Sequence, residues 1–170
     1  ALMAAISYIL AFLEVPMPLA PSFARMDASD VPALLTTFAL GPVAGTVVEL
    51  IKNVLQALST STGGIGELAN FLMGASLVFT AGLIYKQKKT RKMAVVSGVA
   101  GSVAMGIMAA IMNYFVLLPM YQIFMPIDQV IASFAEVIPF IHTKLDVVLY
   151  SALPGNILKG LIVSVITMLV

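Results

Sequence analysis

The chain has 170 residues, of which 61% are hydrophobic and 10% charged, and its mean hydropathy is +1.06. A soluble chain of this length needs many more polar residues to cover its surface, so the composition excludes the soluble class and indicates an integral membrane protein. The formal net charge of +1 gives no sign of nucleic-acid binding, and the lack of cysteine excludes disulfides and thiolate metal sites.

The predicted elements are mostly apolar helices joined by polar connections. In chain order they are the end of a first helix over 1–13, a long loop over 14–32, helices over 31–40 and 43–58, a turn over 59–66, helices over 67–85 and 93–118, a mixed loop over 120–145 and a last helix over 147–170. At about 20 residues per crossing helix, a chain of this length holds five or six spans with short loops. We therefore expect a single all-α transmembrane domain over 1–170.

Proline and glycine set several of these boundaries. Four prolines prevent a continuous helix over 14–32, where Asp30 is expected to cap the helix that follows. Gly41–Pro42 predicts a break between two helices, with one kinked helix as the alternative. Pro119 is expected to end the fifth helix. The apolar stretch over 129–141, in the loop after it, predicts a short interfacial helix.

A short basic segment predicts the orientation in the membrane. Residues 86–92 have the sequence KQKKTRK, with five basic residues in seven. Positive charge beside a span favours the cytoplasmic side, and a merely solvated charge run, the alternative, also lies outside the bilayer. If the helices over 31–40 and 43–58 both count as spans, the two termini and this loop are cytoplasmic. The proline-rich loop over 14–32, the turn over 59–66 and the loop over 120–145 then lie outside.

Small residues predict a close contact between two of the helices. The fifth predicted helix has a small residue at every fourth position, namely Ala94, Gly98, Ser102, Gly106 and Ala110. Such a stripe lets two helix backbones approach each other in a membrane, and Asn113 continues it. The last helix repeats the spacing with Asn156, Gly160 and Ser164, and Lys159 lies beside them. Polar groups on two small-residue faces predict an internal pocket that opens to the outside.

Charged residues inside predicted spans are costly and usually face the protein interior. The spacing of Glu49 and Lys52, next to Asn53, predicts a local ion pair, for which a structural pair near the membrane interface is the favoured interpretation. Lys159 has no carboxylate within four residues, and about 12 Å of helix separates it from Ser151, near the start of its segment, which argues against snorkelling. We favour a ligand carbonyl as its partner, or a distant carboxylate such as Glu49 or Glu67.

The chemistry of these polar groups limits the class of ligand. An asparagine side chain offers donors and an acceptor on a flat amide, so Asn113 and Asn156 together fit an imide or amide edge. Lys159 adds a strong donor for a carbonyl oxygen. The eleven methionines and nine phenylalanines supply soft apolar walls for a planar ring, although most of them face lipid or the core. The residues alone thus predict a small, partly aromatic, neutral polar ligand.

Five segments of the sequence form a recognisable set, namely MDASDVPALLTTFALGPVAG (26–45), KN (52–53), ELANF (67–71), NYFVLLPMY (113–121) and LPGNILKG (153–160). This set resembles the riboflavin-specific S components of energy-coupling factor (ECF) vitamin transporters, the RibU family. It covers most of the chain in the right order. It implies a compact bundle of six transmembrane helices in the bacterial plasma membrane, which binds riboflavin near its outer face and carries no cofactor of its own.

The resemblance also implies roles for individual residues. Amides and a lysine hold the ring in the family, and they match Asn113, Asn156 and Lys159, while the loop over 23–27 is expected to cap the ligand and meet its ribityl chain. SFARMD departs from the hydroxyl residues of relatives in that loop. The expected substrate-binding residues are Asn113, Asn156, Lys159, Asn70, Met26, Asp27, Phe23, Arg25 and Glu67.

Partners follow from the same resemblance. The family docks a transmembrane coupling subunit, the T component, through an A-x-x-x-A face on the first helix, which Ala1 and Ala5 match, and two ABC ATPase subunits supply the energy. Three alternatives stay open. They are an S component for another vitamin, such as thiamine or a pyrimidine precursor, a stand-alone secondary transporter, and a membrane enzyme or flavin-dependent redox protein. The last is the weakest, because the chain has one histidine, His142, and no convergent carboxylate motif.

Overall fold

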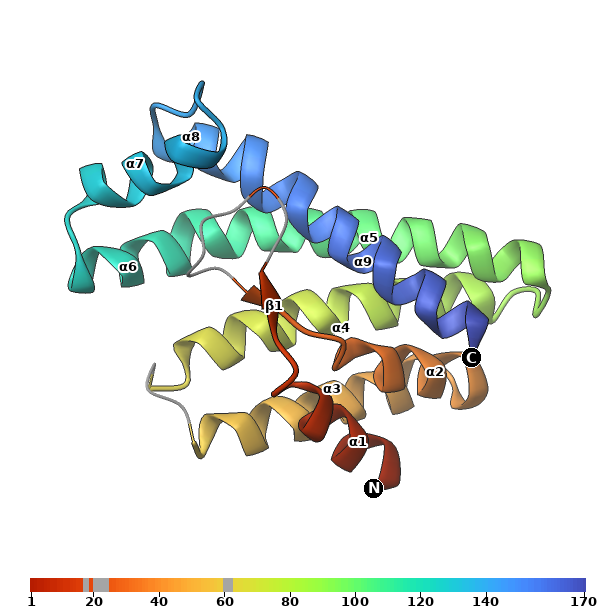
Figure 1. The fold of residues 1–170 in the computed structure, drawn as a ribbon. Helices are drawn as coiled ribbons and strands as arrows, with labels where there is room; N and C mark the ends of the chain where they lie inside the picture. The colour runs from red at the N-terminus through yellow and green to blue at the C-terminus, as the bar shows by residue number, and fades with distance from the viewer. Residues whose placement is uncertain (17–18, 20–24, 60–62) are drawn as a thin grey trace.

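A computed structural model describes residues 1–16, 19, 25–59 and 63–170, and most of them lie in helices (Figure 1). The strands among these residues form one antiparallel pair of two residues each, β1 (Val15–Pro16) and β2 (Arg25–Met26). The helices are α1 (Leu2–Leu10), α2 (Asp30–Leu40), α3 (Pro42–Ala57), α4 (Ile65–Tyr85), α5 (Arg91–Met112), α6 (Leu118–Phe124), α7 (Ile127–Val137), α8 (Lys144–Val147) and α9 (Leu153–Leu169). The predicted all-α class is confirmed.

The break between α2 and α3 lies where Gly41–Pro42 predicts it. Gly41 has a φ of 105°, which a residue with a side chain rarely adopts, and it ends α2 and precedes α3. Pro42 occupies the first turn of α3, where a missing N–H removes no helix bond. The two-helix prediction is therefore confirmed over the single kinked helix.

Pro119 does not end the fifth helix, contrary to the prediction. A π turn, η1 (Asn113–Leu117), follows α5 directly and leads into α6. In it the N–H of Leu118 donates to the carbonyl of Asn113, five residues earlier. A proline inside a regular α-helix clashes with the carbonyl four residues before it. The wider π turn moves that carbonyl aside, so the helix continues through the proline as one 34-residue rod, Arg91–Phe124.

The last helix also contains a π turn before a proline, and it begins earlier than expected. It starts at Lys144, and Thr143 caps it, accepting a hydrogen bond from the N–H of Asp146 (3.2 Å) while the Asp146 carboxylate accepts one from the N–H of Thr143. A second π turn, η2 (Val148–Ala152), then precedes Pro154 and α9. The predicted interfacial helix within the preceding loop is present as a helix, α7.

α5 and α9 pack through the predicted small-residue faces. A Cβ on Gly160 would lie 2.8 Å from the backbone of Ser102, and one on Gly98 would lie 2.9 Å from Ser164. Gly106 faces Ile157 in the same antiparallel register. The close approach of the two backbones therefore depends on these small residues, and it fixes the position of α9 along α5.

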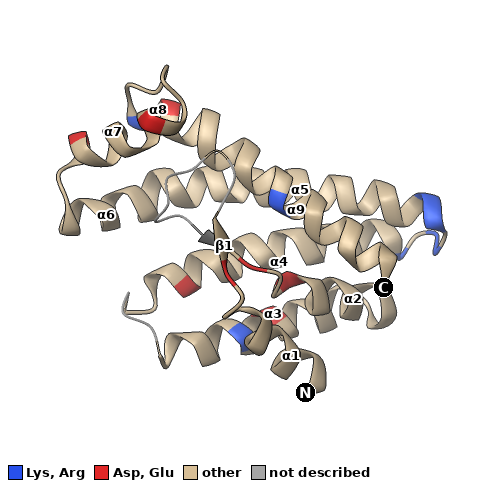
Figure 2. Ribbon diagram, viewed as in Figure 1, with Lys and Arg blue, Asp and Glu red and all other residues tan. Residues whose placement is uncertain are grey.

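Within the described residues, three helices are long and apolar enough to cross a membrane: Ile65–Tyr85, Arg91–Phe124 and Lys144–Leu169. α3 and α2 are shorter, at 16 and 11 residues. Together the helices form an elongated bundle, in which the α2–α3 junction, the α4–α5 connection and the C-terminus lie at one end and α6 to α8 at the other (Figure 1). Blue basic residues mark the α4–α5 connection (Figure 2).

Candidate ligand-binding site

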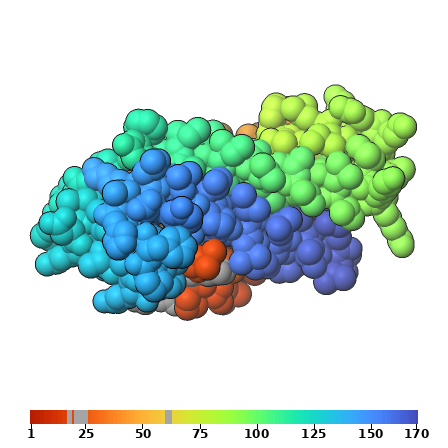
Figure 3. Space-filling model, turned by 90° about the horizontal axis from the view of Figure 1, so that it is seen from above, coloured from red at the N-terminus to blue at the C-terminus, as the bar shows by residue number. Residues whose placement is uncertain are grey.

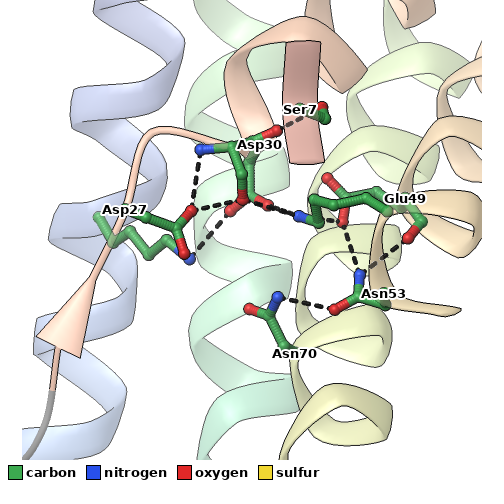
Figure 4. A network of polar contacts seen from close by, with 9 residues as sticks. Ser7, Asp27, Asp30, Glu49, Asn53 and Asn70 are labelled. Carbon is green, nitrogen blue, oxygen red and sulfur yellow. Dashed lines mark hydrogen bonds and ion pairs between the residues drawn. The ribbon is translucent and has the colours of Figure 1, made fainter. Parts of the chain in front are cut away.

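A continuous chain of polar contacts crosses the middle of the bundle (Figure 4). The ammonium of Lys159 on α9 lies 3.0 Å from one oxygen of Asp30, and the other oxygen of Asp30 lies 2.7 Å from the ammonium of Lys52 on α3. Lys52 also pairs with Glu49 at 2.7 Å. The same Glu49 oxygen accepts a hydrogen bond from the Asn53 amide (3.3 Å), which in turn accepts one from Asn70 on α4 (2.8 Å).

The charged residues of this polar chain alternate in sign and are buried. The order is Lys159, Asp30, Lys52 and Glu49, so each carboxylate or ammonium has an opposite charge beside it. Asp30, Glu49 and Lys52 are 0% exposed and Lys159 is 4% exposed. Buried ions persist in a protein when they are paired and hydrogen-bonded, so these ion pairs explain how four ionisable side chains lie inside an apolar bundle.

The position of Asp30 between two lysines corrects two predictions about these charges. Asp30 was expected to cap α2, but Ser29 is the N-cap residue, and the Asp30 carboxylate contacts Lys52 and Lys159 instead. Lys159 does pair with a carboxylate distant in the sequence, but this carboxylate is Asp30 and not Glu49 or Glu67. The Glu49–Lys52 pair itself is confirmed, although it is one link of a network between helices.

The start of α2 is held from several sides. The hydroxyl of Ser29 accepts a hydrogen bond from Lys52 (3.0 Å), and its carbonyl accepts one from Ser7 on α1 (2.6 Å). The Asp27 carboxylate accepts hydrogen bonds from both the N–H (2.8 Å) and the hydroxyl of Ser29. The loop before α2, the first helix and α3 thus fix the position of Asp30 together.

Asn156 and Asn113 lie on the two facing helices, at different depths. Asn156 is 4% exposed and its amide donates to the carbonyl of Ala152 (2.9 Å), whereas the half-buried Asn113 donates to Ala109 (2.7 Å). Each contact uses one of the two N–H donors of the amide. In the register of α5 and α9, the two amides lie about 10 Å apart along the helix axis.

The remaining expected site residues fall into three groups. Asn70 and Glu67 lie half-buried on the first turns of α4, and Asn70 is joined to the polar chain. Met26 and Asp27 are half-buried just before α2, and Arg25 lies in β2. Phe23 lies outside the described residues.

The segment before α2 and the last helix are also in contact. The hydroxyl of Ser151 in η2 donates to the carbonyl of Leu19. Seen from above, orange atoms from the early part of the chain lie directly beside the blue of the last helix (Figure 3). The chain before α2 therefore reaches the helix that carries Asn156 and Lys159.

The described cavities lie elsewhere. One of about 300 Å³ lies at the α2–α3 junction beside Tyr85, Lys86 and Lys89, and an open groove of about 470 Å³ lies on the outer faces of α3, α4 and α5. Across the described ranges, no cluster of three or more histidines and carboxylates could hold a metal ion. The polar chain, by contrast, brings four charged side chains together in the interior of the bundle.

The sequence and the fold both match known proteins. Residues 1–170 match the family described as "ECF transporter, substrate-specific component". The chain is 38% identical over 169 residues to the riboflavin transporter RibU of Staphylococcus aureus (strain TCH60), covering 99% of this chain and 84% of that protein. It is 32% identical over 172 residues to the riboflavin transporter FmnP of Bacillus subtilis (strain 168), covering 99% and 86%.

A solved structure has the same fold. It is described as the S component of a bacterial ECF transporter, and it superposes with a TM-score of 0.75 at 36% identity, covering 99% of this chain and 88% of that one. The arrangement of helices around the polar chain is therefore shared with a transporter component.

Proposed function

Because the chain belongs to the family of ECF transporter substrate-specific components, we propose that it is the high-affinity riboflavin-binding S component of an ECF importer. It binds riboflavin from outside and delivers it inward with an ATPase-driven partner module. The observation that carries this proposal is the similarity, over nearly the whole chain, to two proteins named riboflavin transporters. Since the family consists of transporter components, the chain is not an enzyme.

In this proposal residues 1–170 form one transmembrane domain with six spans. The three long apolar helices supply three of them, and α1, α2 and α3 complete the bundle. Both termini and the loop over 86–92 face the cytoplasm. Five basic residues in that loop support this orientation, as does its position at the same end of the bundle as the C-terminus (Figure 2).

The proposed riboflavin site lies between α4, α5, α9 and the loop before α2. Lys159 donates to a ring carbonyl, and Asn156 and Asn113 bind the polar edge of the isoalloxazine ring. The burial of Lys159 and Asn156 supports this role, because donors shielded from water discriminate strongly between ligands. Asn70 and Glu67 line the site from α4, and Phe23, Arg25, Met26 and Asp27 cover the ribityl chain.

The partners are a transmembrane coupling subunit and two ABC ATPase subunits. We propose that the coupling subunit docks on α1 through Ala1 and Ala5, both of which are exposed. Small residues one helical turn apart let a partner helix approach closely, which supports this surface.

Flavin fluorescence tests the proposal directly. Riboflavin titrated into the detergent-purified protein should lose its fluorescence until one equivalent is bound, and thiamine should not displace it. Lys159→Ala removes a charged hydrogen bond, which contributes about 1.5–3 kcal/mol, so the Kd should rise about 10- to 150-fold.

Lys92→Ala, exposed in the first turn of α5, is the matched control and should bind as the wild type does. Flavin fluorescence that stays unquenched by folded wild-type protein would contradict the proposal. Displacement by thiamine would instead favour an S component for another vitamin.

A further inference from the structure

The polar chain joins two residues of the proposed riboflavin site. One end is Lys159 and the other is Asn70, and between them lie four side chains that the sequence did not place at the site. Asp30 is the member in direct contact with Lys159. It is a candidate for a function of its own, because a carboxylate this deeply buried affects the ammonium beside it more strongly than one in water.

Asp30 is held more rigidly than the lysine that it contacts. It lies in the first turn of a helix, and the neighbouring Ser29 is fixed by Ser7, Asp27 and Lys52. A lysine, by contrast, carries its charge on a flexible four-carbon stem. The geometry therefore lets Asp30 determine where the ammonium of Lys159 lies, rather than the reverse.

The contact also leaves Lys159 able to bind a ligand. An ammonium has three N–H donors, and the ion pair with one Asp30 oxygen engages at most one of them. The second Asp30 oxygen is occupied by Lys52 at 2.7 Å, so Asp30 is itself held between two cations. A ligand carbonyl can thus accept a hydrogen bond from Lys159 without displacing Asp30.

We propose that Asp30 is a positioning residue of the ligand site, which holds the charged ammonium of Lys159 in the orientation that binds a ring carbonyl. This inference rests on the proposed riboflavin function. It predicts that Asp30 acts on binding only through Lys159, and that it acts on the ring of the ligand rather than on its ribityl chain.

Asp30→Asn keeps the shape of the side chain and removes its charge. The Kd for riboflavin should rise about tenfold or more in this variant. The Kd for lumiflavin, which has the ring without the ribityl chain, should rise by the same factor. In a Lys159→Met background, adding Asp30→Asn should leave the Kd unchanged, because the group through which Asp30 acts is then gone.

Thr36→Val is the matched control for a loosened α2. Thr36 is also buried on α2, and its hydroxyl donates a hydrogen bond to the carbonyl of Pro32. Loss of this hydroxyl should lower thermal stability and leave riboflavin binding unchanged. If Asp30→Asn does not fold, Asp30→Glu retains the charge but displaces it by one methylene, and it should weaken both ligands equally.

The outcomes separate the two proposals. Failure of the wild type to bind riboflavin overturns the proposed function and this inference with it. Normal binding by the wild type with unchanged or tighter binding by Asp30→Asn overturns the inference alone. A loss of affinity for riboflavin but not for lumiflavin also overturns the inference, because it would place the carboxylate against the ribityl chain. An equal further loss of affinity on adding Asp30→Asn to Lys159→Met overturns it as well.

Discussion

The role of Lys52 gives the sharpest test of how the bundle tolerates charge in its interior. Its ammonium is 0% exposed and lies 2.7 Å from both Asp30 and Glu49. Lys52→Met keeps the approximate length and volume of the side chain. It leaves the two buried carboxylates with Lys159 as the one cation that remains in the polar chain. Removing one partner of a buried ion pair costs about 3–5 kcal/mol, because the other charge stays buried and uncompensated.

That loss translates into a measurable shift in the unfolding temperature. Each kcal/mol lowers Tm by about 2–4 °C in a protein of this size, so Lys52→Met should unfold about 6–20 °C below the wild type. Circular dichroism of the detergent-solubilised protein on heating measures this difference. Lys88→Met, in the exposed basic loop, is the matched control and should unfold with the wild type.

A second variant tests whether unpaired negative charge causes this loss of stability. Adding Glu49→Gln to Lys52→Met removes one negative charge along with the positive one and leaves the Asp30–Lys159 pair intact. The double variant should therefore be more stable than Lys52→Met alone. A Tm for Lys52→Met within about 2 °C of the wild type would refute the reasoning, because the buried charges would then not depend on each other.

Two further predictions concern packing and helix ends. Gly160→Ala should lower Tm, since its Cβ would lie 2.8 Å from the Ser102 backbone and overpacking costs about 1–3 kcal/mol, whereas Val165→Ala on the exposed side of α9 should change it little. An unchanged Tm for Gly160→Ala would mean that α5 and α9 do not pack this closely. Thr143→Ala should cost about 1 kcal/mol of local stability and speed hydrogen exchange over residues 144–147, whereas Ser133→Ala, on α7, is the control that caps no helix. Unchanged exchange in Thr143→Ala would argue against the capping box.

Local patterns predicted those parts of the fold that depend on neighbours in the sequence. Gly41–Pro42 fixes the α2–α3 break through backbone geometry alone, and the spacing of Glu49 and Lys52 places them on one turn of one helix. The small-residue stripe predicted a close helix contact for a similar reason, since its period matches a helix face. In each case the cause lies within a few residues of the effect.

Features that depend on tertiary contacts were not predictable in this way. Asp30 has the local pattern of a helix cap, and nothing near it in the sequence indicates that Lys52 and Lys159 lie against it. Pro119 has the local pattern of a helix end, but the π turn directly before it lets the helix continue. The hydrogen bond from Asn70 to Asn53 joins two helices whose polar residues gave no indication of a shared contact.

The position of α2 explains why a polar centre exists inside so apolar a chain. α2 begins in the middle of the bundle rather than at its end (Figure 1), so its first turn lies among other helices instead of in water. The Asp27 carboxylate accepts a hydrogen bond from the N–H of Ser29 just before this turn, and the negative charge of Asp30 is favoured at the positive end of the helix dipole. The carboxylate then requires cations, which Lys52 and Lys159 supply from two other helices. A helix that starts inside the bundle thus brings a charged lysine to a buried position on α9, where the proposed ligand needs a donor.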